Sequence, residues 1–274
     1  MNFKIAAFAD EAGSEIAEQI SAMRENGIEY LEIRGVNGES IADLTNEKAR
    51  EIRRLLDDSS ISVWSLGSPY GKHGIEENFE PLLDAFKHGL ELADILGAKH
   101  TRLFSFYVPQ GDAEKYKEEV MRRLDQYCLA AKGSGIILCH ENEKDIYGDI
   151  AVRCKEIHME FPDIKAVFDP ANFIQCGQDT KAAWELLSPY VEYMHIKDAL
   201  WDGTVVPAGK GDGNLPFLLS QYKGEVLTVE PHLTVFDGLE KLESDSKTSM
   251  NKYSYASPRE AFDVAVNALK ELIL

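Results

Sequence analysis

The chain has 274 residues, of which 44% are hydrophobic and 28% charged, and its formal net charge at pH 7 is -18. A chain of this length buries about three quarters of its unfolded surface, so it needs no disulfide or structural metal to hold a core, and any bound metal is expected to be catalytic. The acidic surface repels phosphate backbones and anionic lipids, which argues against nucleic acid or a membrane as a partner.

The cysteine content and the N-terminal segment indicate the compartment. Cys128, Cys139, Cys154 and Cys176 show no CxxC spacing, as expected for reduced thiols. Residues 1–9 are too short and polar for a signal peptide, and no apolar run reaches the length of a membrane helix. These features predict a soluble cytoplasmic protein.

Strand-like runs recur from one end of the chain to the other. They are rich in Val, Ile, Leu and Phe, which is typical of strands buried on both faces of a parallel sheet. Eight such runs are found, at residues 4–9, 29–34, 61–66, 101–106, 135–141, 165–169, 191–197 and 225–230.

Amphipathic segments with recognisable ends lie between these runs. Ser14 is predicted to begin the first helix, and Asp149 the helix that precedes the strand at 165–169. The last helix has the clearest start, because Ser257 at the N-cap is followed by Pro258 at the first helical position and Glu260 three residues after the cap.

Eight strand–helix units over 274 residues predict one α/β domain, a closed (β/α)8 TIM barrel that spans residues 1–274. An open doubly wound sheet usually carries a Gly-rich phosphate loop after its first strand, and the sequence FADEAGSE contains none. The long loops at 67–78 and 231–257 both follow a strand, so they are expected on the active-site face. The second loop is interpreted as a lid or a partner contact.

Four strands in the second half of the chain end near a residue that a hard divalent cation accepts as a ligand. These residues are Glu141, Asp169, His195 and Glu230. A TIM barrel builds its active site at the carboxyl ends of its strands, so the four side chains are expected to meet. Three carboxylates and an imidazole without a thiolate suit Mn2+, Co2+ or Mg2+ and also accept Zn2+. The pattern therefore predicts a metalloenzyme.

Several motifs around these ligands resemble the xylose-isomerase-like TIM barrel superfamily, in particular its sugar phosphate isomerase/epimerase branch. The resemblance begins with FADEAG and EYLEIRG and covers nearly the whole chain. Its later motifs are HEN (140–142), FDPANF (168–173), HIKDA (195–199), PAGKGDGN (207–214) and VEPH (229–232).

The resemblance implies that Glu141, Asp169, His195 and Glu230 hold one metal. It also implies an isomerase or epimerase that acts on a small sugar or sugar-like polyhydroxy carbonyl compound through a metal-stabilised enediolate. In the epimerases of this family the first and last glutamates flank the substrate, so Glu141 and Glu230 are expected to be the acid/base pair. Asn172 stands where ketose 3-epimerases typically have histidine, which argues against that particular reaction.

Five further residues are candidates for contacts with the substrate. Lys197 shares a strand face with His195, so it is expected to bind a substrate oxygen, or else to pair with a nearby carboxylate such as Asp198. Asn172 is expected to bind substrate or to orient a ligand. Glu32, Arg102 and His232 are weighed as substrate contacts against structural salt bridges or caps.

Alternative functions stay open at this point. A keto-inositol-type dehydratase would use the same enediolate, and an inactive barrel would serve as a binding protein. A DNA-repair endonuclease-like phosphodiesterase on the same barrel needs additional metal-binding histidines. This chain has Ser105 and Asn172 in the regions where such an enzyme would need them. The glycines of residues 209–214 either expose N–H groups to a phosphate or simply turn the chain. The chain is compatible with a homo-oligomer, and the expected partner is a small sugar-like molecule.

Overall fold

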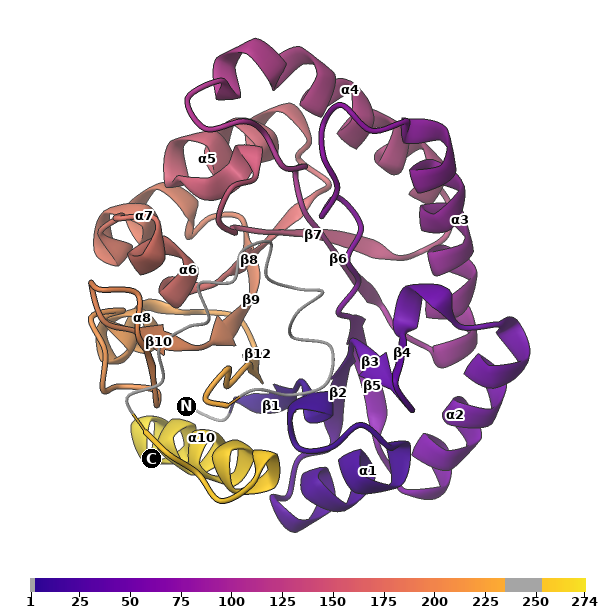
Figure 1. Ribbon diagram of the computed structural model, residues 1–274, viewed down its shortest axis with the longest axis vertical. Helices are drawn as coiled ribbons and strands as arrows, with labels where there is room; N and C mark the ends of the chain where they lie inside the picture. The colour runs from indigo at the N-terminus through magenta and orange to yellow at the C-terminus, as the bar shows by residue number, and fades with distance from the viewer. Residues whose placement is uncertain (1–2, 235–252) are drawn as a thin grey trace.

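Eight parallel strands close into a barrel in the computed structural model, which describes residues 3–234 and 253–274 (Figure 1). Strands that follow one another around the barrel are hydrogen-bonded, and β1 pairs with both β12 and β2, which closes the sheet. All eight predicted strand segments are confirmed. In order around the barrel the strands are β1 (Lys4–Ala7), β12 (Val226–Val229), β9 (Val191–Ile196), β8 (Lys165–Phe168), β7 (Ile137–Glu141), β6 (His100–Leu103), β5 (Ser62–Leu66) and β2 (Tyr30–Ile33).

Helices surround the barrel on its outside (Figure 1). The last helix lies beside the first one, where Arg259 donates to Glu25 at 2.7 Å. No helix in residues 3–234 and 253–274 has both the length and the apolar character that crossing a bilayer requires. The helices are α1 (Ile16–Glu25), α2 (Asn46–Asp58), α3 (Phe79–Leu96), α4 (Ala113–Ala131), α5 (Ala151–Glu160), α6 (Pro170–Gln175), α7 (Thr180–Leu187), α8 (Leu215–Gln221) and α10 (Pro258–Ile273).

Short elements complete the loops. Within residues 3–234 and 253–274, two small antiparallel sheets follow β2 and β9, and three 3-10 helices lie near the strand ends. They are β3 (Gly35–Val36) with β4 (Glu39–Ser40), β10 (Asp198–Ala199) with β11 (Val205–Val206), and the 3-10 helices η1 (Ala9–Glu11), η2 (Ile41–Asp43) and η3 (Tyr147–Asp149).

The apolar core lies both inside and outside the strands. Inside the barrel a small cluster of buried residues includes Cys139, Val167 and Tyr193, with Trp64 packed against it. Outside, the strands pack against the apolar sides of the helices in two larger clusters. Burial on both faces explains why the strand sequences are nearly continuous apolar runs.

The structure confirms one of the three predicted helix starts and corrects the other two. The last one is confirmed, because Ser257 Oγ accepts the N–H of Glu260 and Pro258 is the first residue of α10. The first is one residue early, since Glu15 is the N-cap of α1 and forms a capping box with Glu18. Asp149 is wrong as a cap: it lies in η3 and pairs with Arg153, and α5 begins at Ala151.

The glycine-rich segment after β11 is organised by one carboxylate. Asp198 is buried, and its two oxygens accept the N–H groups of Gly209, Gly211 and Gly213, each at 2.9 Å. A Cβ atom at Gly211 would lie 2.3 Å from Asp198 Oδ1, so this position requires glycine. The N–H groups of these glycines therefore bind the protein's own aspartate rather than forming a cradle for phosphate.

Replacement of Asp198 by alanine should lower the free energy of unfolding by about 2–4 kcal/mol, because it leaves several N–H groups at buried and partly buried positions without an acceptor. Urea unfolding measures the change. Asp212→Ala is the matched control, since Asp212 accepts one N–H, from the exposed Trp201, and should cost less than about 1 kcal/mol. Equal losses in the two variants would contradict this account of the loop.

The two long loops differ in how much of them is described. Residues 67–78 lie at the carboxyl end of β5, on the face that bears the predicted site, as expected. Of the loop at 231–257, residues 235–252 lie outside the described part of the chain. Its role as a lid or partner contact stays a prediction.

Candidate metal centre

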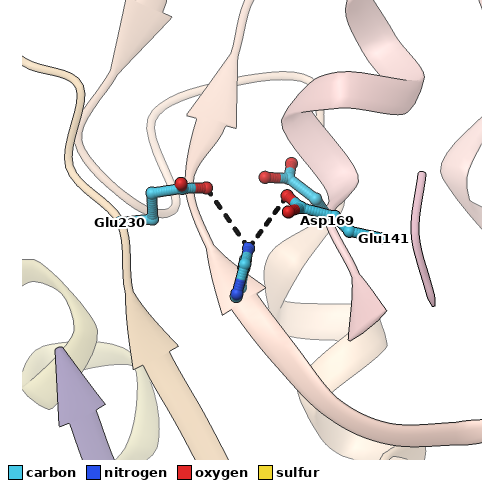
Figure 2. A group of neighbouring side chains, drawn as sticks. Glu141, Asp169 and Glu230 are labelled. Carbon is cyan, nitrogen blue, oxygen red and sulfur yellow. Dashed lines mark hydrogen bonds and ion pairs between the residues drawn. The ribbon is translucent and has the colours of Figure 1, made fainter. Parts of the chain in front are cut away.

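The four predicted ligands meet at the carboxyl ends of their strands. Ligand atoms of Glu141, Asp169, His195 and Glu230 all lie within 4.8 Å of one another, and all four residues are buried. Figure 2 shows the carboxylates of Glu141, Asp169 and Glu230 directed toward a common point from the ends of β7, β8 and β12. The barrel thus brings together residues that are far apart in the sequence.

Local hydrogen bonds hold the carboxylate of Asp169 in place. Its Oδ1 caps α6 by accepting the N–H of Asn172 at 2.9 Å. The side chain of Asn142 pairs with the backbone of Asp169 through two bonds of 2.9 Å. Asn142 and Asn172 thereby join the ends of β7 and β8, which explains the HEN and FDPANF motifs in structural terms.

The imidazole of His195 is surrounded by acceptors. Its Nδ1 lies 2.9 Å from Glu141 Oε1 and 3.3 Å from Glu230 Oε2, and its Nε2 lies 3.2 Å from Glu32 Oε2. A neutral imidazole carries one N–H group, so one ring nitrogen must face carboxylate oxygens with its lone pair unless a proton or a cation lies between them.

Two arginines anchor the glutamates on the side away from His195. Arg102 Nη1 lies 3.0 Å from Glu141 Oε2 and 3.6 Å from Glu230 Oε1, so one nitrogen is placed between the two carboxylates. Arg34 Nη1 lies 3.3 Å from Glu230 Oε1. Arg34 in turn forms two bonds to Asp10, of 2.9 and 3.0 Å, and one of 3.1 Å to Glu11.

The predicted substrate contacts fall into two groups. Arg102, Asn172, Lys197 and His232 all line one small pocket above the ligands, whereas Glu32 does not and is fully buried beneath His195. Lys197 Nζ lies 2.9 Å from Asp169 Oδ2 and 3.1 Å from Glu230 Oε2, so it pairs with these acids and not with Asp198.

Asn172 and His232 each contact one of the ligand glutamates. Asn172 Nδ2 donates to the carbonyl of Asn142 at 2.9 Å and lies 3.4 Å from Glu141 Oε1. His232 Nε2 lies 3.6 Å from Glu230 Oε1, and the backbone N–H of His232 donates to Glu11 at 2.7 Å.

The sequence analysis missed part of this network. Asp10 and Glu11 lie in η1 after β1, and Arg34 directly follows β2. Lys72 in the 67–78 loop pairs with Glu143 at 2.7 Å. The available signal was their position, since each acidic or basic residue follows a strand on the active-site face. Arg34 also borders a second, larger and mostly apolar pocket beside the β3–β4 hairpin.

Acidic groups outnumber permanent cations in this cluster. Six carboxyl groups are buried there beside three buried cations, Arg34, Arg102 and Lys197. Five of the acids, Asp10, Glu11, Glu141, Asp169 and Glu230, contact one of these cations, and Glu32 contacts His195. Three negative charges are thus left without a permanent cation.

Shifted pKa values indicate where protons make up this deficit. Burial raises the pKa of Glu11 to about 8 and that of Asp169 to about 7. Burial alone would lower the pKa of His195, but the charges of Glu141, Glu32 and Glu230 outweigh it and raise this pKa well above its ordinary value. These three shifts all favour the protonated forms of Glu11, Asp169 and His195, which reduces the excess of negative charge.

The donor set fits a divalent cation. Asp169 Oδ2 is buried and makes no hydrogen bond of good geometry, although Lys197 is close, and His195 Nδ1 faces two carboxylates. Three carboxylates and one imidazole could hold the ion, which would take the place of protons on Asp169 and His195.

A family model described as a xylose isomerase-like TIM barrel matches residues 20–227, about three quarters of the chain. The chain therefore belongs to this family. A comparison with the curated proteins found no match in sequence.

Solved structures with the same fold share little sequence with this chain. The probable 3-DHS dehydratase AsbF from Bacillus anthracis has a TM-score of 0.74 at 14% identity, over 98% of this chain and 99% of that one. The IOLI protein with a bound zinc atom has a TM-score of 0.74 at 16% identity, over 98% of both chains. The 3-keto-D-glucoside 4-epimerase YcjR from E. coli has a TM-score of 0.69 at 15% identity, over 99% of both. Such identities show the fold alone.

Replacement of Asp169 by asparagine should weaken the binding of Mn2+ by more than about 100-fold, because it removes a charged ligand while Oδ1 can still cap α6. Isothermal titration of the metal-free protein measures the change, and circular dichroism verifies the fold. Asp163→Asn, at an exposed site before β8, is the control with unchanged affinity. Wild-type affinity in the Asp169 variant would rule out this ligand set.

Proposed function

We propose that this chain is a divalent-metal-dependent isomerase or epimerase that acts on a small sugar or sugar-like polyhydroxy carbonyl compound. The observation that supports this most is the placement of Glu141 and Glu230. Their carboxylates face each other across the site, 2.9 and 3.3 Å from the same nitrogen of His195 (Figure 2). Two carboxylates on opposite sides of one substrate can remove a proton from one face and return it to the other.

A divalent cation held by Glu141, Asp169, His195 and Glu230 would polarise a substrate carbonyl and acidify the neighbouring C–H. Mn2+, Co2+, Mg2+ and Zn2+ all accept this mixture of oxygen and nitrogen ligands. We propose one such ion as the cofactor.

The arginines help to hold the carboxylates of Glu141 and Glu230 in one orientation. Each glutamate has one oxygen near a guanidinium and the other near His195. In Glu141, Oε2 lies near Arg102 and Oε1 near His195. In Glu230, Oε1 lies near Arg34 and Oε2 near His195. Carboxylates held at both oxygens do not rotate freely, so their lone pairs keep one orientation toward the bound substrate. One glutamate takes the proton next to the carbonyl, which gives an enediolate, and the other delivers a proton to the opposite face.

The pocket above the ligands offers mainly hydrogen-bond donors. Lys197, Arg102 and Asn172 line it together with His232, and each has a nitrogen that can donate to a hydroxyl or carbonyl oxygen. A compound with several adjacent oxygens matches such a lining. The apolar pocket beyond Arg34 leaves room for a further part of the substrate.

A dehydratase that acts on a keto-inositol or a similar ring is the second candidate. It would form the same enediolate with the same glutamates and then expel a hydroxyl group as water. The fold is compatible with both reactions, since the similar structures include a probable dehydratase and an epimerase. The mass of the product separates the two, because a dehydratase releases water and an epimerase leaves the mass unchanged.

Glu230→Gln and Glu141→Gln should each slow exchange of the substrate proton on one face of the reacting carbon by about 100-fold to 10,000-fold, because each removes the group that transfers the proton on that face. The measurement is deuterium uptake from D2O by a panel of ketoses and keto-sugars, followed by mass spectrometry with the Mn2+-loaded protein.

Glu192→Gln is the matched control, because Glu192 pairs with His100 near the amino-terminal ends of β9 and β6, away from the site. This variant should exchange at the wild-type rate. Exchange at the wild-type rate from both epimers by either active-site variant, or full exchange by protein stripped with EDTA, would contradict the proposed function.

A further inference from the structure

We propose that Glu32 positions the metal ligand His195: it accepts the Nε2–H of the imidazole and so turns the lone pair of Nδ1 toward the metal. This inference rests on the proposed function, because it concerns the same metal site. It gives Glu32 a role other than the substrate contact expected from the sequence.

The contacts of Glu32 support this role. Its Oε2 lies 3.2 Å from His195 Nε2, and its Oε1 accepts the hydroxyl of Tyr193 at 2.7 Å. The hydroxyl of Tyr193 also lies 3.2 Å from Ser65 Oγ. Both oxygens of the carboxylate therefore have fixed partners inside the barrel, and the side chain has one orientation.

The location of Glu32 separates it from the substrate. It is fully buried, and it is absent from the lining of the pocket above the ligands. The pairing of β2 with β5 shifts register between Leu31 and Glu32, and such an irregularity in a strand can redirect a side chain. Glu32 therefore contacts the metal ligand His195 from below, on the side away from the pocket.

The alternative tautomer of His195 is disfavoured by the same contacts. With the proton on Nδ1, the lone pair of Nε2 would face Glu32, an acceptor that is held in place by Tyr193. With the proton on Nε2, the lone pair of Nδ1 faces Glu141 and Glu230, which is the side where the ligand atoms gather. Phe8 packs edge-on against the imidazole, with ring centroids 5.2 Å apart, and limits its rotation.

The negative charge of Glu32 adds a second effect. Among the described residues, His195 is the ion-pair partner of Glu32. A carboxylate hydrogen-bonded to a metal-binding imidazole raises the basicity of the ligating nitrogen, and loss of such a partner typically weakens metal binding about 10-fold to 100-fold.

Glu32→Gln should therefore weaken Zn2+ binding by about 10-fold or more, measured by isothermal titration of the metal-free protein. Gln is nearly isosteric and its amide oxygen can still accept the Nε2–H, so the loss reports mainly the missing charge. Tyr193→Phe keeps the charge and should have a smaller effect. Glu192→Gln, which alters another His–Glu contact of 3.0 Å in the same barrel, should leave the affinity unchanged.

A measurement on the wild-type protein tests the tautomer without any substitution. In protein labelled with 15N-histidine and loaded with Zn2+, NMR should show His195 protonated at Nε2 and bound to the metal through Nδ1. The opposite tautomer would overturn the inference, even if the Glu32 variant did not fold.

The results also separate this inference from the proposed function. Tight Zn2+ binding to the wild type with the same affinity in Glu32→Gln would refute the role of Glu32 and leave the metal site intact. Failure of the wild type to bind Zn2+ would remove the metal site and both proposals with it.

Discussion

Buried negative charge at the mouth of the barrel is the constraint on which the site depends. Carboxylates removed from water are costly unless they are paired, protonated or bound to a cation. This protein combines all three. Arginine and lysine side chains pair with several of the acids, and raised pKa values favour protons on Glu11 and Asp169. The four predicted ligands together suit a divalent ion. The same acids that make the site costly are the ones that, in the proposed function, would bind the metal and take the proton of a substrate.

The surrounding cations also determine geometry. Arg102 lies between Glu141 and Glu230, and Arg34 joins Glu230 to the acidic residues after β1. Each of these groups comes from a different strand end, so the closed sheet fixes their distances. The barrel therefore supplies rigid positions, and the charged side chains supply the forces that orient one another.

Much of this was predictable from the sequence, for a physical reason. A parallel barrel places the carboxyl ends of all strands on one face, so Glu141, Asp169, His195 and Glu230 could be assigned to one site from their positions alone. Apolar runs buried on both faces identified the strands. The cap of α10 was also predictable, because it depends on neighbouring residues only.

Other features depend on contacts that sequence spacing does not encode. Asp149 resembles a helix cap, but its contact with Arg153 and the 3-10 turn place the helix start later. Glu32 was expected near the substrate, and the structure places it beneath His195, since its direction depends on a register shift in β2 and on Tyr193 from another strand. Arg34 was missed because its partners lie in η1 and just after β12, at positions that are separated from it in the sequence.

The central claim is that one divalent cation occupies the point where these side chains meet. The most direct measurement is an anomalous difference map from crystals of the protein grown with Mn2+. The account predicts a single strong peak within coordination distance of Glu141, Asp169, Glu230 and Nδ1 of His195. A map without a peak there, or with the ion bound only at other residues, would contradict it.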